Sequence, residues 1–387
     1  MRRSRLLPLL LAPLLLCSGC SGSAVWANPR QLEQIQLIQT VGVDADGDDV
    51  RLSVSTGKPM GDEAPLRMTQ AAPSLELAMD RLQSYAANAS LFYAHTRFLV
   101  VGEDAAAAGV APYLDFVSRD SDMRLSTPMF LLRGGTARDA VLETGDDKTD
   151  ITENLSAMQQ DIAQQGTSHA FTCSEIIQSL ATSGSALVCA ARRVPQPDRP
   201  EAGDTLLPCG YAILKDGALA GFICDPMDMG VNLLLGLGGH GDILLRDANG
   251  DAVTVAVDSS KGGFRPVWGA DGTLRRIDVT LQVRAAVQEL AGTTRLSDEA
   301  VRAQLEAALA ETVRGWVSAL LEQSQTLAAD FLGIGGILGE RYPAKWQRVR
   351  AQWPALLPTM DFQVSVEAEI ERTFDLQDPV PVTGGAP

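Results

Sequence analysis

The sequence predicts an α+β fold, with several domains of mixed sheets packed with helices. Three observations carry this prediction. Segments in which apolar and polar residues alternate, as in strands, recur between segments with helical spacing. One helical segment in the C-terminal half is long and amphipathic. The chain has 387 residues and is 45% hydrophobic, which is enough for more than one core at about 150 residues per domain.

The N-terminus has the three parts of a secretory signal. Three arginines precede an apolar run over residues 6–16. This run is shorter than the ~20 residues that a membrane-spanning helix needs. Residues 16–20 read LCSGC and match a lipobox. We therefore expect removal of residues 1–19 and lipidation of Cys20; the alternative is an ordinary signal peptide cut after Ala27.

The charge of the chain excludes some partners. Losing the three arginines of the signal changes the formal net charge from −16 to −19. Such an acidic surface disfavours binding to nucleic acid and to anionic lipid. Membrane attachment would then depend on acyl chains, of which one holds marginally and two or three hold stably.

The first predicted domain alternates strands and helices. Ser74 is the expected N-cap of its first helix, and Asp46-Gly47-Asp48 is the expected turn between its first two strands. Strands are predicted at 35–44, 50–54, 97–101 and 129–132, and helices at 74–85, 105–108, 113–117 and 137–142.

A proline-rich segment of charged residues follows and cannot bury a core. We interpret it as a linker between two domains. The predicted organisation is a signal peptide (1–19), a lipidated tether (20–27), an N-terminal α+β domain (28–194), the linker (195–207), a C-terminal α+β domain (208–374) that either stays whole or divides into subdomains 208–270 and 271–374, and a flexible tail (375–387).

The second domain opens with a predicted hairpin around Asp216-Gly217, a strong two-residue turn signal. A long helix is predicted from Ser297 to about Phe331, because its apolar residues recur at steps of three, four or seven. That apolar stripe comprises Val301, Leu305, Leu309, Val313, Trp316, Leu320, Leu327 and Phe331. Other elements are a helix at 227–235, strands at 253–257, 277–283 and 361–370, and a short helix carrying Tyr342, Trp346, Val349 and Trp353.

Four cysteines remain once Cys17 has left with the signal and Cys20 is lipidated. An exported protein can form disulfides, although four buried free thiols are the alternative. A two-residue hairpin loop places Cys209 opposite Cys224, with Cα atoms ~4.5–5.5 Å apart, within disulfide range. The same register places Tyr211 opposite Phe222. We therefore consider a Cys209–Cys224 disulfide, with Cys173 and Cys189 unpaired or joined to each other.

No residue set indicates catalysis or a bound metal. The three histidines lie far apart, without metal-ligand spacing. The glycine-rich segment 236–241 lacks the spacing of a Walker or Rossmann loop. The charged stretch Arg119–Arg124 is interpreted as solvated ion pairs of little energetic worth, with a polar site as the alternative. The sequence therefore predicts neither an enzyme nor a cofactor.

Several short motifs occur in one order along the chain. They are Cys20 with Trp26, Arg30-Gln31-Leu32-Glu33, Val41-Gly42-Val43-Asp44, His95-Thr96-Arg97, Val100-Val101-Gly102-Glu103, the segment 210–217, Ala329-Asp330-Phe331-Leu332-Gly333-Ile334-Gly335, Arg341-Tyr342-Pro343 and Trp346. Together they resemble the Ger(x)C lipoproteins, the C subunits of bacterial spore germinant receptors. Gln31 stands where that family usually has Glu.

The resemblance implies a lipoprotein on the outer face of the spore inner membrane, held there by its N-terminal lipid. It implies that the chain works with two integral-membrane subunits, of the A and B types, to trigger germination in response to nutrients. It supplies no catalytic residues. The alternative is a lipid-anchored extracytoplasmic solute-binding protein or envelope hydrolase, which would show two similar lobes around a cleft or a convergent polar site.

Overall fold

A computed structural model describes the chain over residues 35–57, 64–86, 89–142, 150–196, 198, 204–238, 241–290 and 299–371. The predicted signal peptide, Cys20, the tether and the tail lie outside the described residues. The described part consists of mixed sheets covered by helices, which confirms the predicted α+β class. Within it, no helix is both long and apolar enough to cross a membrane.

The larger sheet has eight strands in the order β10-β9-β8-β7-β6-β2-β3-β4. Parallel strands form its centre, and antiparallel strands extend it at both edges. The central strands are β2 (Thr40–Asp46), β6 (Phe98–Gly102), β7 (Met129–Leu132) and β8 (Ser185–Pro195). The outer strands are β3 (Asp49–Ser55), β4 (Arg67–Ala72), β9 (Asp204–Lys215) and β10 (Ala218–Ile223).

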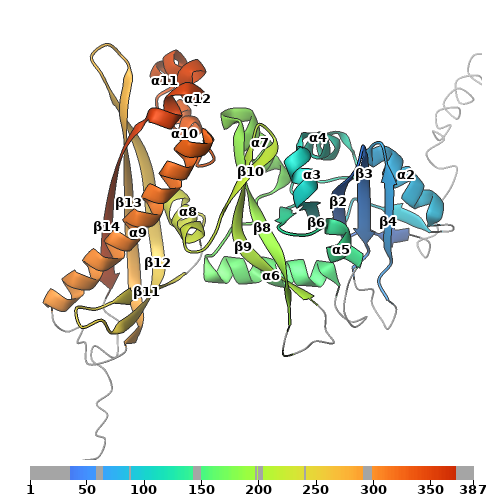
Figure 1. The fold of residues 1–387 in the computed structure, drawn as a ribbon, viewed down its shortest axis with the longest axis horizontal. Helices are drawn as coiled ribbons and strands as arrows, with labels where there is room; N and C mark the ends of the chain where they lie inside the picture. The colour runs from blue at the N-terminus through green and yellow to red at the C-terminus, as the bar shows by residue number, and fades with distance from the viewer. Residues whose placement is uncertain are drawn as a thin grey trace, which may run out of the picture.

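Helices cover both faces of this sheet (Figure 1). Side chains alternate between the faces along a strand, so Leu99 and Val101 of β6 enter one core while Phe98 and Val100 enter the other. The first core is completed by α2 (Leu75–Tyr85), α3 (Glu103–Ala108), α4 (Ala111–Arg119) and α7 (Cys173–Ser183). The second core is completed by α5 (Ala137–Leu142) and α6 (Ile151–Gln165).

Two short strands, β1 (Ile35–Leu37) and β5 (Ser90–Phe92), pair in parallel as a separate small sheet. The strand expected over 35–44 is therefore broken. Its two halves, β1 and β2, belong to different sheets, because the chain changes partners at residues 38–39.

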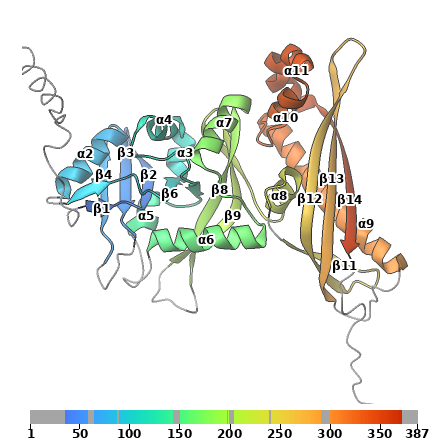
Figure 2. The ribbon, with the colours of Figure 1, turned by 180° about the vertical axis from the view of Figure 1, so that it is seen from behind.

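The C-terminal sheet has the order β11-β12-β13-β14. Its strands are β11 (Asp242–Arg246), β12 (Ala252–Trp268), β13 (Leu274–Leu290) and β14 (Asp361–Glu371). The last two run parallel, and parallel neighbours need a crossover connection. The long helix α9 (Glu299–Leu327) is part of that crossover and lies along one face of the sheet, as both ribbon views show (Figures 1 and 2).

The buried face of α9 differs slightly from the predicted stripe. Leu305, Leu309, Val313 and Leu320 are buried as expected. Trp316 is only half-buried, and Val317 takes the place expected for it in the core. The helix ends at Leu327, so Phe331 is buried beyond it. The crossover continues through α10 (Ile334–Arg341), α11 (Pro343–Val349), the 3₁₀ turns η4 (Arg350–Gln352) and η5 (Leu357–Thr359), and α12 (Trp353–Leu356).

Both ends of the segment that we expected to be a linker lie in paired β-strands. β8 runs to Pro195 and β9 starts at Asp204, and the two pair antiparallel up to these ends. The hairpin partner β10 then adds to the edge of the larger sheet. Pro195 and Pro208 lie in the ends of β8 and β9 that extend past β7 and β10, where each strand pairs on one side only. Proline is tolerated at such positions, which explains why composition alone indicated a linker.

A third hydrophobic core lies between the two sheets and contains residues of both. Tyr211, Ile213 and Ile223 of the larger sheet pack in the same cluster as the C-terminal sheet and α9. The helix α8 (Met227–Leu235) lies between the sheets (Figure 2). Two hydrogen bonds join the larger sheet to α9: Lys215 Nζ donates to the Leu327 carbonyl at 2.8 Å, and Gln323 Nε2 donates to the Phe222 carbonyl at 2.9 Å.

Candidate functional site

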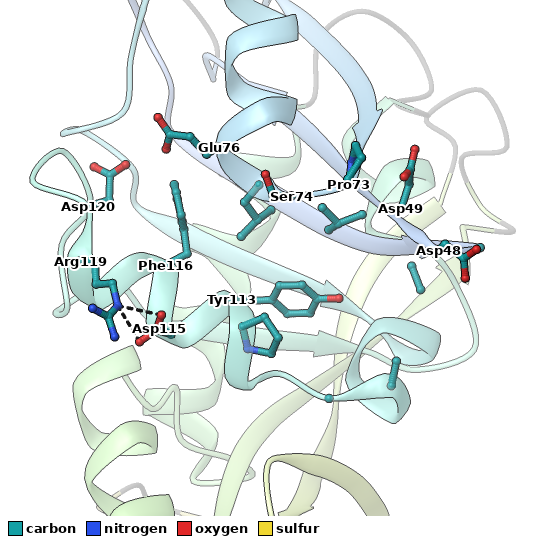
Figure 3. Close-up of a pocket in the computed structure, with 17 residues that line it drawn as sticks. Asp48, Asp49, Pro73, Ser74, Glu76, Tyr113, Asp115, Phe116, Arg119 and Asp120 are labelled. Carbon is teal, nitrogen blue, oxygen red and sulfur yellow. Dashed lines mark hydrogen bonds and ion pairs between the residues drawn. The ribbon is translucent and has the colours of Figure 1, made fainter.

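A pocket of about 620 Å³ opens at one end of the larger sheet (Figure 3). Four segments line it: the turn between β2 and β3, the start of α2, the connection between α3 and α4, and α4 itself. It lies beyond the carboxyl end of the parallel strand β2, which is where open α/β sheets usually bind ligands.

Local sequence signals shape the walls of this pocket. Gly47 adopts a positive φ of 64° in the turn between β2 and β3. Ser74 caps α2 by accepting a hydrogen bond from the Leu77 N–H at 3.3 Å. Pro112 occupies the first turn of α4, where a missing N–H costs nothing. These three signals fix the ends of the elements that surround the cavity.

The rim of the pocket is acidic. Its carboxylates are Asp48, Asp49, Glu76, Asp115 and Asp120, and its single cation is Arg119. The Arg119 Nε donates to both oxygens of Asp115, at 2.9 and 2.8 Å, and this hydrogen bond lowers the pKa of Asp115. The guanidinium is therefore already paired, and four rim carboxylates have no cation on the pocket wall.

Two aromatic side chains of α4, Tyr113 and Phe116, line the pocket between the acidic groups (Figure 3). Burial raises the pKa of Tyr113, and the charge of Asp44 raises it further. Both rings also line a separate apolar recess of only about 10 Å³. Tyr93 lines this recess as well; it is 6% exposed, and its hydroxyl has no hydrogen-bond partner.

Behind Tyr113, the buried carboxylate of Asp44 holds the start of α5. It accepts hydrogen bonds from the N–H groups of Ala137 and Arg138, both at 2.7 Å. Burial raises the pKa of Asp44, and these two hydrogen bonds oppose the rise. Asp44 therefore acts as a helix cap at the first turn of α5, a structural role for the last residue of the Val41-Gly42-Val43-Asp44 motif.

The pocket includes part of one candidate stretch from the sequence. Arg119 and Asp120, at the start of the charged segment 119–124, line it. The two described histidines contact phenylalanines elsewhere: the ring of His95 is tilted against that of Phe92, and His169 packs edge-to-face with Phe171. His240 lies outside the described residues. Sequence reasoning missed the aromatic pair of α4 as pocket residues, although their spacing of three places them on one helix face.

The hairpin of β9 and β10 departs from the predicted register. Lys215 faces Ala218 as expected, and Asp216 and Gly217 have the positive φ values of a type I′ turn. A bulge at Ala220 then shifts the pairing by one residue, so that Ile223 rather than Phe222 faces Tyr211. The predicted register, which paired Tyr211 with Phe222 and placed Cys209 opposite Cys224, is therefore wrong, because a single extra residue moves every later partner.

The two hairpin cysteines are free thiols that share a neighbour. Arg133 Nη1 donates to the Cys224 sulfur at 2.9 Å, and its guanidinium lies 4.6 Å from the centre of the Phe222 ring. Burial raises the pKa of the Cys209 thiol to about 11, while the charge of Arg133 acts to lower it. A disulfide between Cys209 and Cys224 stays a prediction. Cys173 and Cys189 are buried free thiols.

The lining of this pocket includes no histidine, cysteine or lysine, and its ionisable groups are five carboxylates, Arg119 and Tyr113. Among the residues that the structure describes, no group of three or more His, Cys, Asp or Glu could hold a metal ion. Carboxylates and aromatic rings around an open pocket can select a ligand by charge and shape.

Comparison with known protein families assigns both halves of the chain. The model of the spore germination protein N-terminal domain matches residues 28–192, and the model described as spore germination B3/GerAC like, C-terminal, matches residues 209–374. The chain belongs to the GerAC-like spore germination family.

Two relatives of this GerAC-like chain span nearly its full length. It is 23% identical to the spore germination protein KC of Bacillus subtilis (strain 168) over 407 residues, covering 98% of each chain. Its fold is similar to the crystal structure of the GerBC protein, with a TM-score of 0.57 and 16% identity, over 85% of this chain and 96% of the other. The two family segments meet at the β8–β9 hairpin.

A second motif residue of the GerAC-like chain repeats the role of Asp44. Asp330 is 3% exposed and accepts hydrogen bonds from the N–H groups of Ile334 and Gly335, at 2.8 and 2.7 Å, and from Trp353 Nε1 at 2.9 Å. It thus joins the start of α10 to α12. Asp44 and Asp330, two of the aspartates in these motifs, therefore both hold helices in place.

Proposed function

We propose that this chain is a non-enzymatic lipoprotein subunit of a nutrient germinant receptor, which triggers spore germination together with two integral-membrane subunits. The observation that carries the proposal is the match of two spore germination family models to residues 28–192 and 209–374, in order and over nearly the whole chain. The curated relative named above is a spore germination protein, and its role is extended here to this chain.

The proposed attachment is a lipid on Cys20, which would place the protein on the outer face of the spore inner membrane. Fourteen residues lie between Cys20 and Ile35. A chain of that length reaches at most about 50 Å. Such a tether would keep the folded part within reach of membrane subunits and raise its effective concentration there.

The fold disfavours the alternative of a solute-binding protein with two similar lobes. The larger sheet has eight strands with a parallel centre, whereas the C-terminal sheet has four strands that are mostly antiparallel. These sheets are unlike in size and topology, so they do not form duplicated halves around a cleft. This supports a role in assembly with partners.

Replacing the anchor tests the proposal. The variant Cys20→Ala should remain unprocessed or leave the membrane fraction, and a matched Cys17→Ala variant should stay processed and membrane-bound. If Cys20→Ala stays membrane-bound after complete removal of the signal, the anchor is elsewhere. In the same strains, affinity purification of the wild-type protein from spore membranes should recover two multi-pass membrane proteins, and failure to recover either would overturn the receptor assignment.

A further inference from the structure

We propose that the free edge of β14 binds an added β-strand from a partner protein, a strand in which basic and apolar residues alternate. β14 is the outer strand of the C-terminal sheet, beside β13, as both ribbon views show (Figures 1 and 2). A partner strand would continue the sheet by main-chain hydrogen bonds, and its alternate side chains would provide specificity. This inference goes beyond the proposed receptor role, and its failure would leave that role untouched.

β14 is less protected than the other outer strands of the eight-stranded and C-terminal sheets. β4 and β11 have only six and five residues, and short edge strands resist pairing with another chain. β10 contains the bulge at Ala220, and Gln323 donates to its Phe222 carbonyl. β14 instead has eleven residues, which pair with β13 without a register shift. A long and regular edge of this kind is a template for a further strand.

The main-chain groups on the outer side of β14 are available for such pairing. The Ile370 N–H points away from β13, since it donates to Glu306 Oε1 of α9 at 3.0 Å. The N–H and C=O groups of successive residues point to alternate sides of a strand, so every second residue before Ile370 also directs them outward. These residues are Phe362, Val364, Val366 and Ala368. Within the described part of the chain, their outward groups have no hydrogen-bond partner.

The side chains of the same four residues favour an apolar partner on that face of the sheet. They pack against the core on the side of α9 but remain partly exposed. The corresponding residues of β13 are fully buried, since β13 has a strand on each side; they are Ile277, Val279, Leu281 and Val283. Apolar residues of an added strand would cover the row on β14 in the same way.

The opposite face of β14 is acidic and selects the charge of the partner. Its exposed residues are Asp361, Gln363, Ser365, Glu367, Glu369 and Glu371. Glu369 pairs with Arg284 at 3.2 Å, whereas Glu367 accepts from the neutral amide of Gln282 at 3.2 Å. Opposite charges on facing residues of neighbouring strands stabilise a sheet, and like charges destabilise it. Basic residues therefore fit this face, and a second copy of β14 does not.

Fluorescence anisotropy on the full exported chain tests the inference with three labelled peptides. KVKVKVK alternates basic and apolar residues, VVVKKKK has the same composition without alternation, and EVEVEVE reverses the charge. We expect saturable 1:1 binding of KVKVKVK, binding of VVVKKKK about tenfold weaker or more, and no binding of EVEVEVE. Equal binding of the two lysine peptides, or no binding of KVKVKVK, would overturn the inference.

Two variants locate the binding on β14. Val366→Pro removes one outward N–H but none that β13 needs, and it should weaken KVKVKVK binding about tenfold. Glu367→Gln keeps an acceptor for Gln282 but removes the charge, and it should weaken binding about two- to fivefold at low salt. The matched control Glu76→Gln makes the same charge change on α2, beside the other sheet, and should leave binding unchanged.

Thermal unfolding shows whether Val366→Pro is folded, and Glu367→Gln decides the question if it is not. If Glu76→Gln weakens KVKVKVK as much as Glu367→Gln does, the binding reflects the overall acidic charge, and the proposed site is wrong. The rival occupant is a second copy of the chain. A dimer in sedimentation equilibrium that Val366→Pro or Glu367→Gln separates into monomers would replace the partner strand with self-association.

Discussion

Gly102 lies directly against Asp44, and a Cβ atom at Gly102 would come within 2.1 Å of Asp44 Oδ1. That oxygen cannot move away freely, because it accepts the Ala137 N–H at 2.7 Å. Two motifs that lie more than fifty residues apart in the sequence therefore meet at one contact. Only glycine at the end of β6 leaves room for the carboxylate that caps α5.

Replacing Gly102 should therefore destabilise the protein. We expect Gly102→Ala to lower the free energy of unfolding by about 1–3 kcal/mol, as other overpacked sites do. The control is Gly315→Ala in α9, where a Cβ would meet nothing within 4 Å and should raise stability by up to about 1 kcal/mol. Urea denaturation measures both. If Gly102→Ala leaves the urea midpoint of unfolding unchanged, the side chain of Asp44 can move away from residue 102 without loss of stability, and the expectation is wrong.

The buried carboxylate of Asp330 should make stability depend on pH. Burial raises its pKa to about 6 in the folded protein, whereas in the unfolded chain the usual value is near 4. The folded state then binds the proton of Asp330 more tightly than the unfolded chain does. The stabilisation from this protonated group is therefore complete below about pH 4 and is lost as the pH rises through about 6. The expected loss is on the order of 2–3 kcal/mol.

Urea denaturation at several pH values between 4 and 7 checks this expectation. The variant Asp330→Asn has no proton to lose, so its stability should fall less over this range than that of the wild type. It should also be less stable throughout, because its amide cannot accept all three hydrogen bonds that the carboxylate accepts. Equal pH slopes for the two proteins would contradict the raised pKa.

Trp316 and Trp353 should differ in their contributions to stability. Trp316 is half-buried on α9, where its Cβ lies close to Gly230. We expect Trp316→Ala to lower stability by about 2 kcal/mol. Trp353 is 4% exposed and donates to Asp330, so Trp353→Ala should cost about 3–5 kcal/mol, as is typical of a buried tryptophan. Thermal unfolding compares them, and a larger loss at Trp316 would place it deeper in a core than the structure does.

The predicted Cys209–Cys224 disulfide can be tested under oxidation. After treatment of the native protein with diamide, we expect a non-reduced peptide map to contain a Cys209–Cys224 crosslink. Closing a loop of about 15 residues gives about 3 kcal/mol in the chain-entropy model. Arg133 now contacts the Cys224 thiol and must move aside. Cys173, buried elsewhere, is the internal control. Alkylation of both hairpin cysteines after oxidation would rule the bond out.

Several elements follow directly from local sequence patterns. The helix at Met227–Leu235 and the turn at Asp216-Gly217 occur as predicted, and the strand predicted at 361–370 is observed at Asp361–Glu371. Each has a signal within a few residues: helical spacing, alternation or a type I′ turn pair. The helices α6 and α7 were not predicted, although α7 has a capping box between Thr172 and Glu175, which the sequence could have shown.

Other features depend on contacts between distant segments. The bulge at Ala220 has only a weak local signal, the neighbouring Gly221, since a glycine inside a strand often marks a bulge. Farther along the same pair of strands, Gly210 lies so close to β10 that a Cβ would come within 2.0 Å of the Ile223 carbonyl oxygen. The pocket likewise joins residues 45–50, 73–76 and 108–120. Periodicity predicts that these segments exist but not which ones become neighbours, so the acidic rim could not be predicted.

The β8–β9 hairpin determines how this family can be recombined. A cut in the proline-rich interval would separate two paired strands and leave β8 with an open edge, the kind of edge that promotes aggregation. A chimera of two relatives should instead exchange segments after β10, near Cys224, where the chain leaves the sheet and enters α8. The boundary that the proline-rich composition suggests and the best position for joining two relatives therefore differ by about the length of one hairpin.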